Sequence, residues 1–598
     1  MNRFFNHAKG CATAAALALA VSSPAFAISK TVTVTNAGTL RTLISSSEKN
    51  EVTSLTVSGT LNGSDILFIR EMAGVNAIGE ATGGKLTELN MADVTLTDGG
   101  DAYYEDPWSR YYTATSYDVS ESEDEYYCTD LSYAFTGSNL TSVVWPSTMW
   151  EVGEGALSYC FDLKKFALGS ETNEIKSHAF YRCTSLDSFT FTPKIIYIDD
   201  FAFSNCTSLK SAALPDGVEK VDKSCFSGCT SLMSVTLGSD VSEICEMAFN
   251  GCTALTSVEL PSSLKTIGNS AFDGCTALTE ITLPKKLKTL GSAVFEGCTA
   301  LNAIKVAEGN TAFASAEGVL FNKALTKLLV CPTGKAGAYA VPEGTEEIAA
   351  SAFSRCSALT SVSMPQTLTT IGEQAFYRCA GITELTLPNS VTSVGGYFVY
   401  RCPNLKRVTL GTGLSEVSEC MLYNATGLES ISIPEGYTAI KYEAIAGCTN
   451  LKSVSLPSTI SSIDSKAFSG NSALESFTIK AATPATITAD VFEDVDQSAC
   501  VLYVPEASVA AYKADEQWGK FKNISGIVPT GISSPTPGSL SVSEAGGVLT
   551  VTGAQGSIEV YTLTGVRVAS GVNDLSVKLA GGVYVVNAGG KATKAIVR

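Results

Sequence analysis

Cysteine recurs every 23 residues through most of this chain. It occupies positions 160, 183, 206, 229, 252, 275 and 298, and the same register returns at 356, 379, 402 and 448. An aromatic or aliphatic residue lies three positions before most of these cysteines, as at Phe203 and Phe272, and leucine lies three positions after most of them, as at Leu278. A fixed period of this length indicates a repeat architecture, in which each period is one structural unit.

Each period has the pattern of one coil of a solenoid. Val258 and Leu260 alternate with polar residues before Pro261, which predicts a short strand, and Ala271-Phe272 before Cys275 predicts a short helical turn. Too few side chains become buried in one unit to offset the entropy of ordering it, so neighbouring coils must share a core. We therefore expect a solenoid of about fourteen coils over residues 131–525, with a parallel β-sheet on its concave face.

The cysteine ladder allows three interpretations: disulfides, metal ligands or buried reduced thiols. Removing Cys11 with the N-terminal segment leaves an odd number, 17 of the 18 cysteines, and Ala425 and Asn471 replace cysteine in register. A metal site would have to use Cys225, Cys229, Cys245 and Cys252, whose spacing lacks the short pairs of structural zinc sites. We favour buried thiols and expect neither a metal nor a cofactor. The predicted structural ladder comprises Cys183, Cys206, Cys229, Cys252, Cys275, Cys298, Phe203, Phe272 and Leu278.

The repeat resembles the BspA-like leucine-rich repeat family of bacterial surface proteins from the Bacteroides group. The segment 255–275, Leu-Thr-Ser-Val-Glu-Leu-Pro-Ser-Ser-Leu-Lys-Thr-Ile-Gly-Asn-Ser-Ala-Phe-Asp-Gly-Cys, carries this resemblance most clearly. Residues 57–65 resemble the N-terminal cap of such proteins, and residues 502–505 with Tyr512 and Trp518 resemble a closing cap. Residues 318–323 with Cys331-Pro332 resemble a hairpin that interrupts the array, which we place near 307–342.

The two ends of the chain have different patterns from the repeats. Residues 1–27 combine Arg3 and Lys9, an apolar run and Ala25-Phe26-Ala27, which predicts a signal peptide. No later apolar stretch is long enough to predict a transmembrane span. Residues 526–540 are rich in Gly, Ser, Thr and Pro and predict a linker. Residues 541–598 predict a small antiparallel β-sandwich; this segment resembles the C-terminal sorting domain of type IX secretion substrates, with a plain β domain as the alternative.

Composition limits the chemistry that this chain can perform. Its formal charge of −18, or −20 without Arg3 and Lys9, argues against binding to nucleic-acid phosphates. The only histidines are His7 and His178, so histidine metal sites and a Ser/His/Asp triad are poorly supported. His178 falls at a surface-turn position of the repeat. We therefore expect a protein that is not an enzyme.

One segment, within the predicted N-terminal cap of residues 28–130, suggests a binding site. Residues 101–127 contain seven tyrosines and one tryptophan beside the acids Glu121, Glu123, Asp124 and Glu125. Tyrosine and tryptophan are enriched in binding hot spots, whereas the alternative is an aromatic cap over the open core of the first coil. The candidate partner-binding residues are Tyr103, Tyr104, Trp108, Tyr111 and Tyr112.

The family resemblance implies adhesion by an exported protein at the cell surface, at the outer membrane or outside the cell. The implied partner is a host matrix protein or another cell, and the implied role is non-catalytic macromolecular binding. The alternative is a surface glycan-binding protein for nutrient capture, using the same aromatic insert. The partner is thus a protein or a glycan, and the sequence leaves the oligomeric state open.

Overall fold

The computed structural model describes residues 27–114, 118–119 and 125–527, and residues 541–545, 548–552, 557–562, 566–572, 575–588 and 591–597. Most of the predicted signal peptide, the acids at positions 121, 123 and 124, and residues 528–540 of the predicted linker lie outside these ranges. The chain forms two compact units, residues 1–526 and 527–598. Each unit is described by itself.

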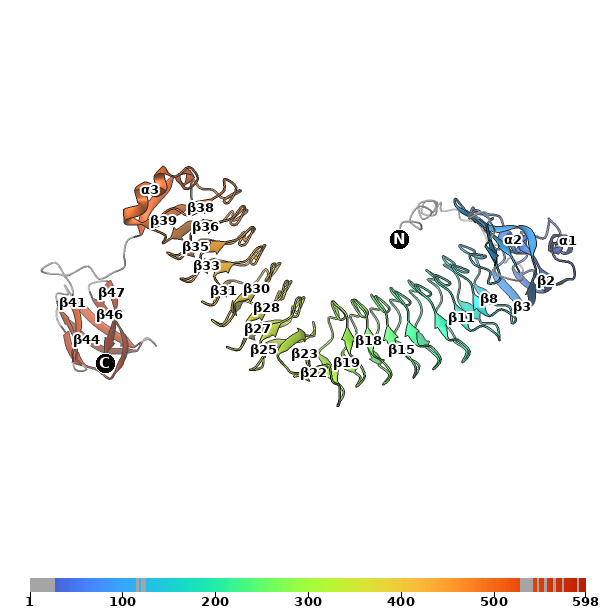
Figure 1. Ribbon diagram of the computed structural model, residues 1–598, viewed down its shortest axis with the longest axis horizontal. Helices are drawn as coiled ribbons and strands as arrows, with labels where there is room; N and C mark the ends of the chain where they lie inside the picture. Colours follow the sequence, from blue (N-terminus) through green and yellow to red (C-terminus); the bar gives the residue numbers. More distant parts are fainter. Residues whose placement is uncertain are drawn as a thin grey trace. The chain divides into compact units, whose positions relative to one another are not determined.

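Nearly every repeat contributes one short strand to a parallel ladder, called here the main ladder (Figure 1). Neighbouring strands pair at a spacing of 23 residues, so that Val235 lies beside Val258. Within β17 only the central Val258 is buried, and the flanking polar residues are exposed. The parallel solenoid predicted from the 23-residue period is thereby confirmed. The strands of the main ladder within the repeats are β8 (Ser142–Val144), β10 (Lys165–Ala167), β13 (Ser211–Ala213), β15 (Ser234–Thr236), β17 (Ser257–Glu259), β19 (Glu280–Leu283), β21 (Ala303–Val306), β25 (Gly337–Ala340), β27 (Leu359–Ser363), β29 (Glu384–Thr386), β31 (Arg407–Thr409), β33 (Ser430–Ser432), β35 (Ser453–Leu456) and β37 (Ser476–Ile479).

A second parallel ladder, called here the edge ladder, consists of strands only two residues long. It keeps the same spacing, with Ile244 beside Ile267. Its strands are β9 (Glu151–Val152), β11 (Glu174–Ile175), β12 (Tyr197–Ile198), β14 (Lys220–Val221), β16 (Glu243–Ile244), β18 (Thr266–Ile267), β20 (Thr289–Leu290), β26 (Glu347–Ile348), β28 (Thr370–Ile371), β30 (Ser393–Val394), β32 (Glu416–Val417), β34 (Ala439–Ile440), β36 (Ser462–Ile463) and β38 (Thr486–Ile487).

After the edge ladder each coil makes a run of tight turns, called here the turn edge, where the sequence predicted a short helical turn. The backbone amides alternate between two kinds of acceptor. Ser227 N donates to Ser224 O within its own coil, whereas Phe226 N donates to Ala248 O of the next coil, at 2.9 Å. Two residues per coil take positive φ, as Ser224 (52°) and Gly228 (74°) do. The helical prediction was wrong because half of these amides bond between coils, which satisfies them without a helix.

The core is a set of matching slots repeated from coil to coil. One slot holds a stack of phenylalanine rings whose neighbouring centroids lie 5.1–6.0 Å apart and whose planes differ by 5–13°. The stack contains Phe180, Phe203, Phe226, Phe249, Phe272 and Phe295. Leu278 and the ladder cysteines are fully buried in neighbouring slots. The buried side chains of the first unit form two clusters, one ending at Leu320 and the other beginning at Val319.

The two clusters meet at the predicted interruption. There β22 (Phe313–Ala316) and β23 (Val319–Asn322) form an antiparallel hairpin, and β24 (Lys327–Val330) pairs with β23. β24 also pairs in parallel with β26, so the hairpin continues directly into the edge ladder. On the turn edge, Arg355 Nε lies 2.7 Å from Glu296 Oε1 and joins the coils on either side.

The main ladder extends beyond the 23-residue repeats at the N-terminal end. β1 (Ser29–Val34), β2 (Ser54–Leu61) and β3 (Glu88–Leu96) pair in parallel in the order β1-β2-β3-β8. The short helix α1 (Leu40–Leu43) follows β1, and α2 (Gly63–Met72) begins at a capping box between Asn62 and Asp65. Three further strands thus join the fourteen that the repeats contribute to the main ladder.

The other end of the solenoid is covered by β39 (Val501–Pro505), α3 (Val509–Ala514) and β40 (Asn523–Ile527), with one-turn 3₁₀ segments at Glu506–Ser508 and Trp518–Lys520. Trp518 and Tyr512 are fully buried, and Trp518 Nε1 donates to Ala485 O at 2.8 Å. These aromatic rings close the open core of the last coil.

The second unit contains two antiparallel sheets around a small core of its own. One sheet has the order β41-β42-β45 and the other has the order β44-β43-β46-β47. The strands are β41 (Ser541–Ala545), β42 (Val548–Thr552), β43 (Ser557–Thr562), β44 (Arg567–Val572), β45 (Leu575–Lys578), β46 (Gly582–Ala588) and β47 (Lys591–Val597). The antiparallel C-terminal fold predicted from the alternating pattern is confirmed.

Candidate functional site

The aromatic insert forms a small sheet beside the first coils. It contains β4 (Gly99–Asp106), β5 (Ser109–Thr113), β6 (Asp118–Val119) and β7 (Glu125–Cys128), in the order β4-β5-β7-β6. β4 and β5 are antiparallel and place Tyr104 opposite Tyr111. The described strands of the insert thus bring its tyrosines next to the first repeat.

Four tyrosine rings pack between the insert and the first repeat. Tyr104 stacks on Tyr133 at 5.2 Å, and Tyr111 meets Tyr133 edge to face at 5.0 Å. Tyr111 also stacks on Tyr126 at 5.2 Å. Burial raises the pKa of both Tyr104 and Tyr111, which keeps their hydroxyl groups neutral. Tyr104 and Tyr111 therefore pack against the first repeat at Tyr133.

Tyr103 and Arg70 are buried beneath these rings. Both are 0% exposed, so Tyr103 offers no surface to a partner in this conformation. The Arg70 guanidinium donates to the carbonyl oxygens of Asn76, Tyr133 and Ala134 at 2.8–3.1 Å and lies 5.1 Å from the Tyr104 ring centroid. Burial lowers the pKa of Arg70 to about 10. Arg70 thereby fastens α2 to the first repeat, a role that nothing in the sequence pattern indicated.

Trp108 lies apart from these tyrosines, in the turn between β4 and β5. Its side chain is 61% exposed, and its backbone amide donates to Asp106 Oδ1 at 2.8 Å. Tyr112 on β5 is half-buried. Trp150, which the sequence reasoning did not single out, is 71% exposed just before β9. Of the five predicted binding residues, Trp108 is exposed and Tyr103 is fully buried, whereas Tyr104, Tyr111 and Tyr112 are half-buried.

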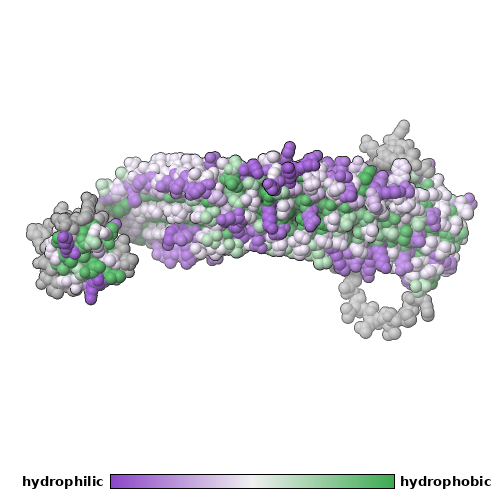
Figure 2. Space-filling model, turned by 90° about the horizontal axis from the view of Figure 1, so that it is seen from below, coloured by the Kyte–Doolittle hydropathy of each residue, from purple (hydrophilic) through white to green (hydrophobic). Residues whose placement is uncertain are grey.

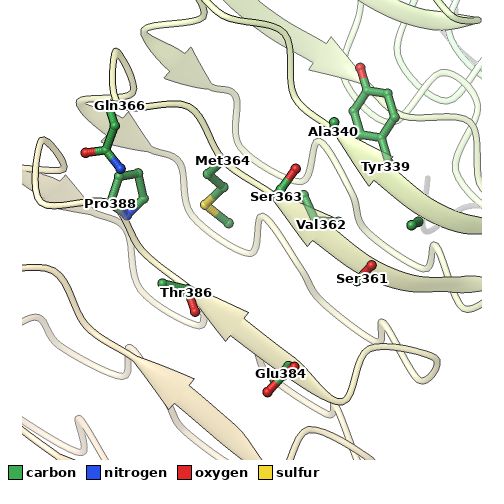
Figure 3. A pocket seen from close by; sticks show the side chains of 11 residues that line it. Tyr339, Ala340, Ser361, Val362, Ser363, Met364, Gln366, Glu384, Thr386 and Pro388 are labelled. Atoms are coloured by element: carbon green, nitrogen blue, oxygen red, sulfur yellow. The ribbon is translucent and has the colours of Figure 1, made fainter. Parts of the chain in front are cut away.

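The solvent-facing side of the main ladder consists largely of short polar side chains. A shallow hollow of about 500 Å³ lies over β25, β27 and β29. Figure 3 shows Ser361 and Ser363 on one of these strands and Glu384 and Thr386 on the next. Hydrophilic and hydrophobic side chains are mixed along the face of the solenoid seen in Figure 2. This surface is open to contact along its length rather than enclosing a substrate.

The cysteine ladder is a hydrogen-bonded part of the core. Cys229 Sγ donates to Phe203 O of the preceding coil at 3.1 Å, and Cys252 Sγ donates to Phe226 O at 3.2 Å. Asn471, which replaces cysteine, donates from Nδ2 to Ile445 O at 2.8 Å. The slot therefore selects small side chains, and cysteine and Asn471 also donate a hydrogen bond there, whereas Ala425 fills it without a donor. Burial raises the pKa of Cys229 and Cys298 to about 12, so their thiols stay protonated at neutral pH.

A second aromatic surface lies on the turn edge near the middle of the chain. Tyr377 stacks on Tyr400 at 5.6 Å, and Tyr400 lies 5.6 Å from Tyr423. The Arg378 and Arg401 guanidinium groups lie 5.1 and 5.2 Å from the Tyr377 and Tyr400 ring centroids. An alignment of the repeats would have shown this signal, since tyrosine recurs two residues before the ladder position in three successive coils.

Other features of the described residues bear on catalysis and membrane anchoring. No group of three or more His, Cys, Asp or Glu side chains is placed to hold a metal ion within the described ranges. His178 stacks on Phe201 at 4.9 Å on the turn edge, and burial lowers its pKa. No helix in this part of the chain is long and apolar enough to cross a bilayer.

Comparison with known proteins gives one family and several structural relatives. The model of the BspA type leucine rich repeat region matches residues 131–254, 219–328, 337–444 and 417–501. A leucine rich cell surface protein from Faecalibacterium prausnitzii is 25% identical, with 64% of this chain and 94% of that chain covered and a TM-score of 0.40. A leucine-rich repeat protein from Bacteroides ovatus is 23% identical, with coverage of 61% and 93% and a TM-score of 0.39.

The pneumococcal vaccine antigen PcpA is 21% identical, with 71% of this chain and 89% of that chain covered and a TM-score of 0.38. No curated protein matches the chain. The family matches span more than half of the chain and follow the 23-residue register of the main and edge ladders. The chain therefore belongs to the family of proteins with a BspA type leucine rich repeat region.

Proposed function

We propose that this protein is a non-catalytic adhesin, displayed at the cell surface or secreted, that attaches to a host matrix protein or to another cell. The observation that carries the proposal is the open solenoid, whose main ladder presents a long, shallow polar face. Such a surface suits contact with a macromolecule, because solenoids use extended faces as binding surfaces. The similarity to a leucine rich cell surface protein supports the proposed location.

The proposed contact site is the exposed rim of the aromatic insert, formed by Trp108 and Tyr112. Tyr104 and Tyr111 support this rim through their contacts with Tyr133. A rigid turn that holds an exposed indole gives a large contact area at a low cost in conformational entropy. Tyr103, Tyr104 and Tyr111 therefore contribute to binding through positioning rather than contact.

The test is a binding panel of matrix proteins with residues 28–527 as the parent and Trp108→Ala/Tyr112→Ala as the variant. We expect the variant to lose most of the binding while its unfolding free energy stays within about 1 kcal/mol of the parent. Trp150→Ala is the matched control, since it removes another exposed tryptophan. Binding by the variant that equals that of the parent would contradict the proposed site.

The second candidate is capture of glycans as nutrients. The exposed Trp108 ring favours it, because a flat indole can pack against a sugar ring. Running a panel of neutral glycans beside the matrix proteins separates the two candidates. Binding to a glycan that is abolished by Trp108→Ala, with no matrix protein bound, would favour nutrient capture over adhesion.

We also propose that the C-terminal unit is a sorting domain for type IX secretion, acting after export by the N-terminal signal peptide. The pairing of β43 with β46, which places Val560 beside Val586, and of β46 with β47 provides a compact antiparallel core separate from the solenoid. A domain that folds by itself can be recognised by a secretion system without contributing to the repeat fold. The alternative is a β domain that stays on the mature protein.

A further inference from the structure

The turn edge places one residue of each coil, immediately before the ladder cysteine, at positive φ. Six coils use glycine there, at φ of 69–76°. They are Gly228, Gly251, Gly274, Gly297, Gly447 and Gly470. Glycine is the expected choice, because side chains with a Cβ adopt this conformation at an energetic cost.

Arginine takes this unfavourable position in three successive coils. Arg355, Arg378 and Arg401 have φ of 60°, 57° and 59°. Arginine is not among the residues that tolerate left-handed backbone well, as asparagine does. Backbone strain of this kind is concentrated at functional sites, which gives a reason to look for a ligand of these guanidinium groups.

The three arginines differ in their partners. Arg355 is paired with Glu296 at 2.7 Å. The guanidinium groups of Arg378 and Arg401 instead lie over Tyr377 and Tyr400, and no ion pair within 4.0 Å involves them among the described residues. Two cations thus remain uncompensated on the surface of a strongly acidic protein.

The backbone holds these side chains in a fixed array. Arg378 N donates to Tyr400 O of the next coil at 2.9 Å, and the rings of Tyr377, Tyr400 and Tyr423 follow one another at 5.6 Å. The resulting surface offers a guanidinium fork in two successive coils, at Arg378 and Arg401, beside the tyrosine rings. Guanidinium forks match carboxylate and sulfate groups by two parallel hydrogen bonds.

We propose that Arg378 and Arg401, with Tyr377, Tyr400 and Tyr423, form a binding site for an anionic polysaccharide. The regular spacing favours this ligand over an acidic polypeptide. An extended peptide presents side chains on one face about every 6.8 Å, two residues at about 3.4 Å each, which exceeds the 5.6 Å between successive rings. A linear polysaccharide with one carboxylate or sulfate per sugar has a repeat close to one coil. The same combination recurs at Arg182, which lies over Tyr159 and Tyr181 at φ of 61°.

This site differs from the proposed rim at Trp108 in position and in ligand, so the failure of one proposal would leave the other unaffected. The decisive variant is Arg378→Gly/Arg401→Gly, because glycine is the native residue at this position in six other coils. The substitution removes both cations without demanding a new backbone conformation. We expect its melting temperature to stay within about 2 °C of that of the parent.

The binding measurement uses calorimetry at low ionic strength with polygalacturonate, heparin, neutral dextran and polyglutamate as probes. We expect the parent to bind at least one of the two anionic polysaccharides. Binding of polygalacturonate alone would indicate that the site recognises carboxylates, and binding of heparin alone would indicate that it recognises sulfates. The double glycine variant should bind that polysaccharide at least about tenfold more weakly, since hydrogen bonds to charged groups are the strong ones. Binding should also weaken as salt increases.

The control is Lys406→Gln/Arg407→Gln on the main ladder side, which removes the same number of positive charges from groups paired with Glu429 and Glu384. This variant should keep the parent affinity within about twofold, because surface ion pairs contribute little. Three results would overturn the proposal. They are no binding of either polysaccharide by the parent, equal binding by the glycine variant, and binding of polyglutamate as tight as that of the polysaccharides.

Discussion

Replacing Phe272 with alanine tests whether the coils share one core in the way the structure indicates. The Phe272 side chain is fully buried. Its ring stacks on Phe249 at 5.4 Å and on Phe295 at 6.0 Å. Burial and cavity formation give a cost of about 3–5 kcal/mol. The two ring contacts account for about 1–3 kcal/mol of this, at about 0.5–1.5 kcal/mol each.

The loss of stability should stay confined to the coils beside Phe272, because each coil packs only on its neighbours. Phe272 belongs to the core cluster that ends at Leu320, and Phe376 belongs to the cluster that begins at Val319. Hydrogen exchange followed by mass spectrometry should show exchange about 10²- to 10³-fold faster in the coils beside Phe272, since each 1.4 kcal/mol corresponds to tenfold. Peptides from residues 337–524 should exchange as in the parent.

The reciprocal variant, Phe376→Ala, should loosen the coils around residue 376 and leave residues 131–300 unchanged. Phe376 has its own stacking partner, Phe353, at 4.8 Å. Phe161→Ala is the neutral control, because that side chain is 47% exposed. Equal loosening along the whole solenoid after either core substitution would refute local coupling, and so would loosening confined to the opposite cluster.

Four further predictions concern the thiols, the cap and the C-terminal unit. Denatured protein should titrate at least eleven free thiols while native protein reacts slowly; mass spectrometry that finds Cys252 linked to Cys275 would contradict this. Burial raises the pKa of Cys229 and Cys448 to about 12, from about 8.5 in the unfolded chain. As pH rises, these thiols therefore lose their protons first in the unfolded state, which stabilises that state. Unfolding monitored by circular dichroism should show that the free energy of unfolding falls as pH rises from about 8.5 toward 12. Arg70→Lys should destabilise the first coils by about 2 kcal/mol, since lysine lacks the fork that reaches three carbonyl groups; unchanged exchange in residues 131–160 would count against this role. Deleting residues 541–598 should leave the solenoid folded but retained in the periplasm, and normal surface display of the truncated protein would exclude the sorting role.

The solenoid could be predicted from sequence because its core slots recur at a constant spacing. The N-terminal strands were not predicted as part of the ladder because their spacing differs: Ser54 pairs with Glu88, 34 residues away, rather than with a residue 23 positions on. The tight turns were predicted as helical because left-handed backbone at Ser224 and Ser270 is imposed by bonds between coils and leaves no mark in residue type.

The candidate site was predicted only in part. The cluster of aromatic residues was visible in the sequence, but their separation into buried and exposed rings depends on the β4–β5 pairing and on contact with Tyr133. Tyr103 and Trp108 therefore looked equivalent, although one is fully buried and the other is 61% exposed. The row of Tyr377, Tyr400 and Tyr423 was missed because its members are neighbours across coils and lie 23 residues apart in the chain.

The direction of the strands also determines how this molecule responds to force. Strands lie across the stacking direction, so tension between the two ends of the solenoid pulls the hydrogen bonds of each ladder apart one coil at a time. A released coil of 23 residues can extend to about 78 Å at about 3.4 Å per residue, whereas it adds only about 4.8 Å to the stack. A coil that unfolds therefore becomes about sixteen times longer than the length that it contributes to the folded stack. A solenoid anchored at one end and attached at the other would lengthen stepwise under flow, and its attachment point would be shielded from sudden load.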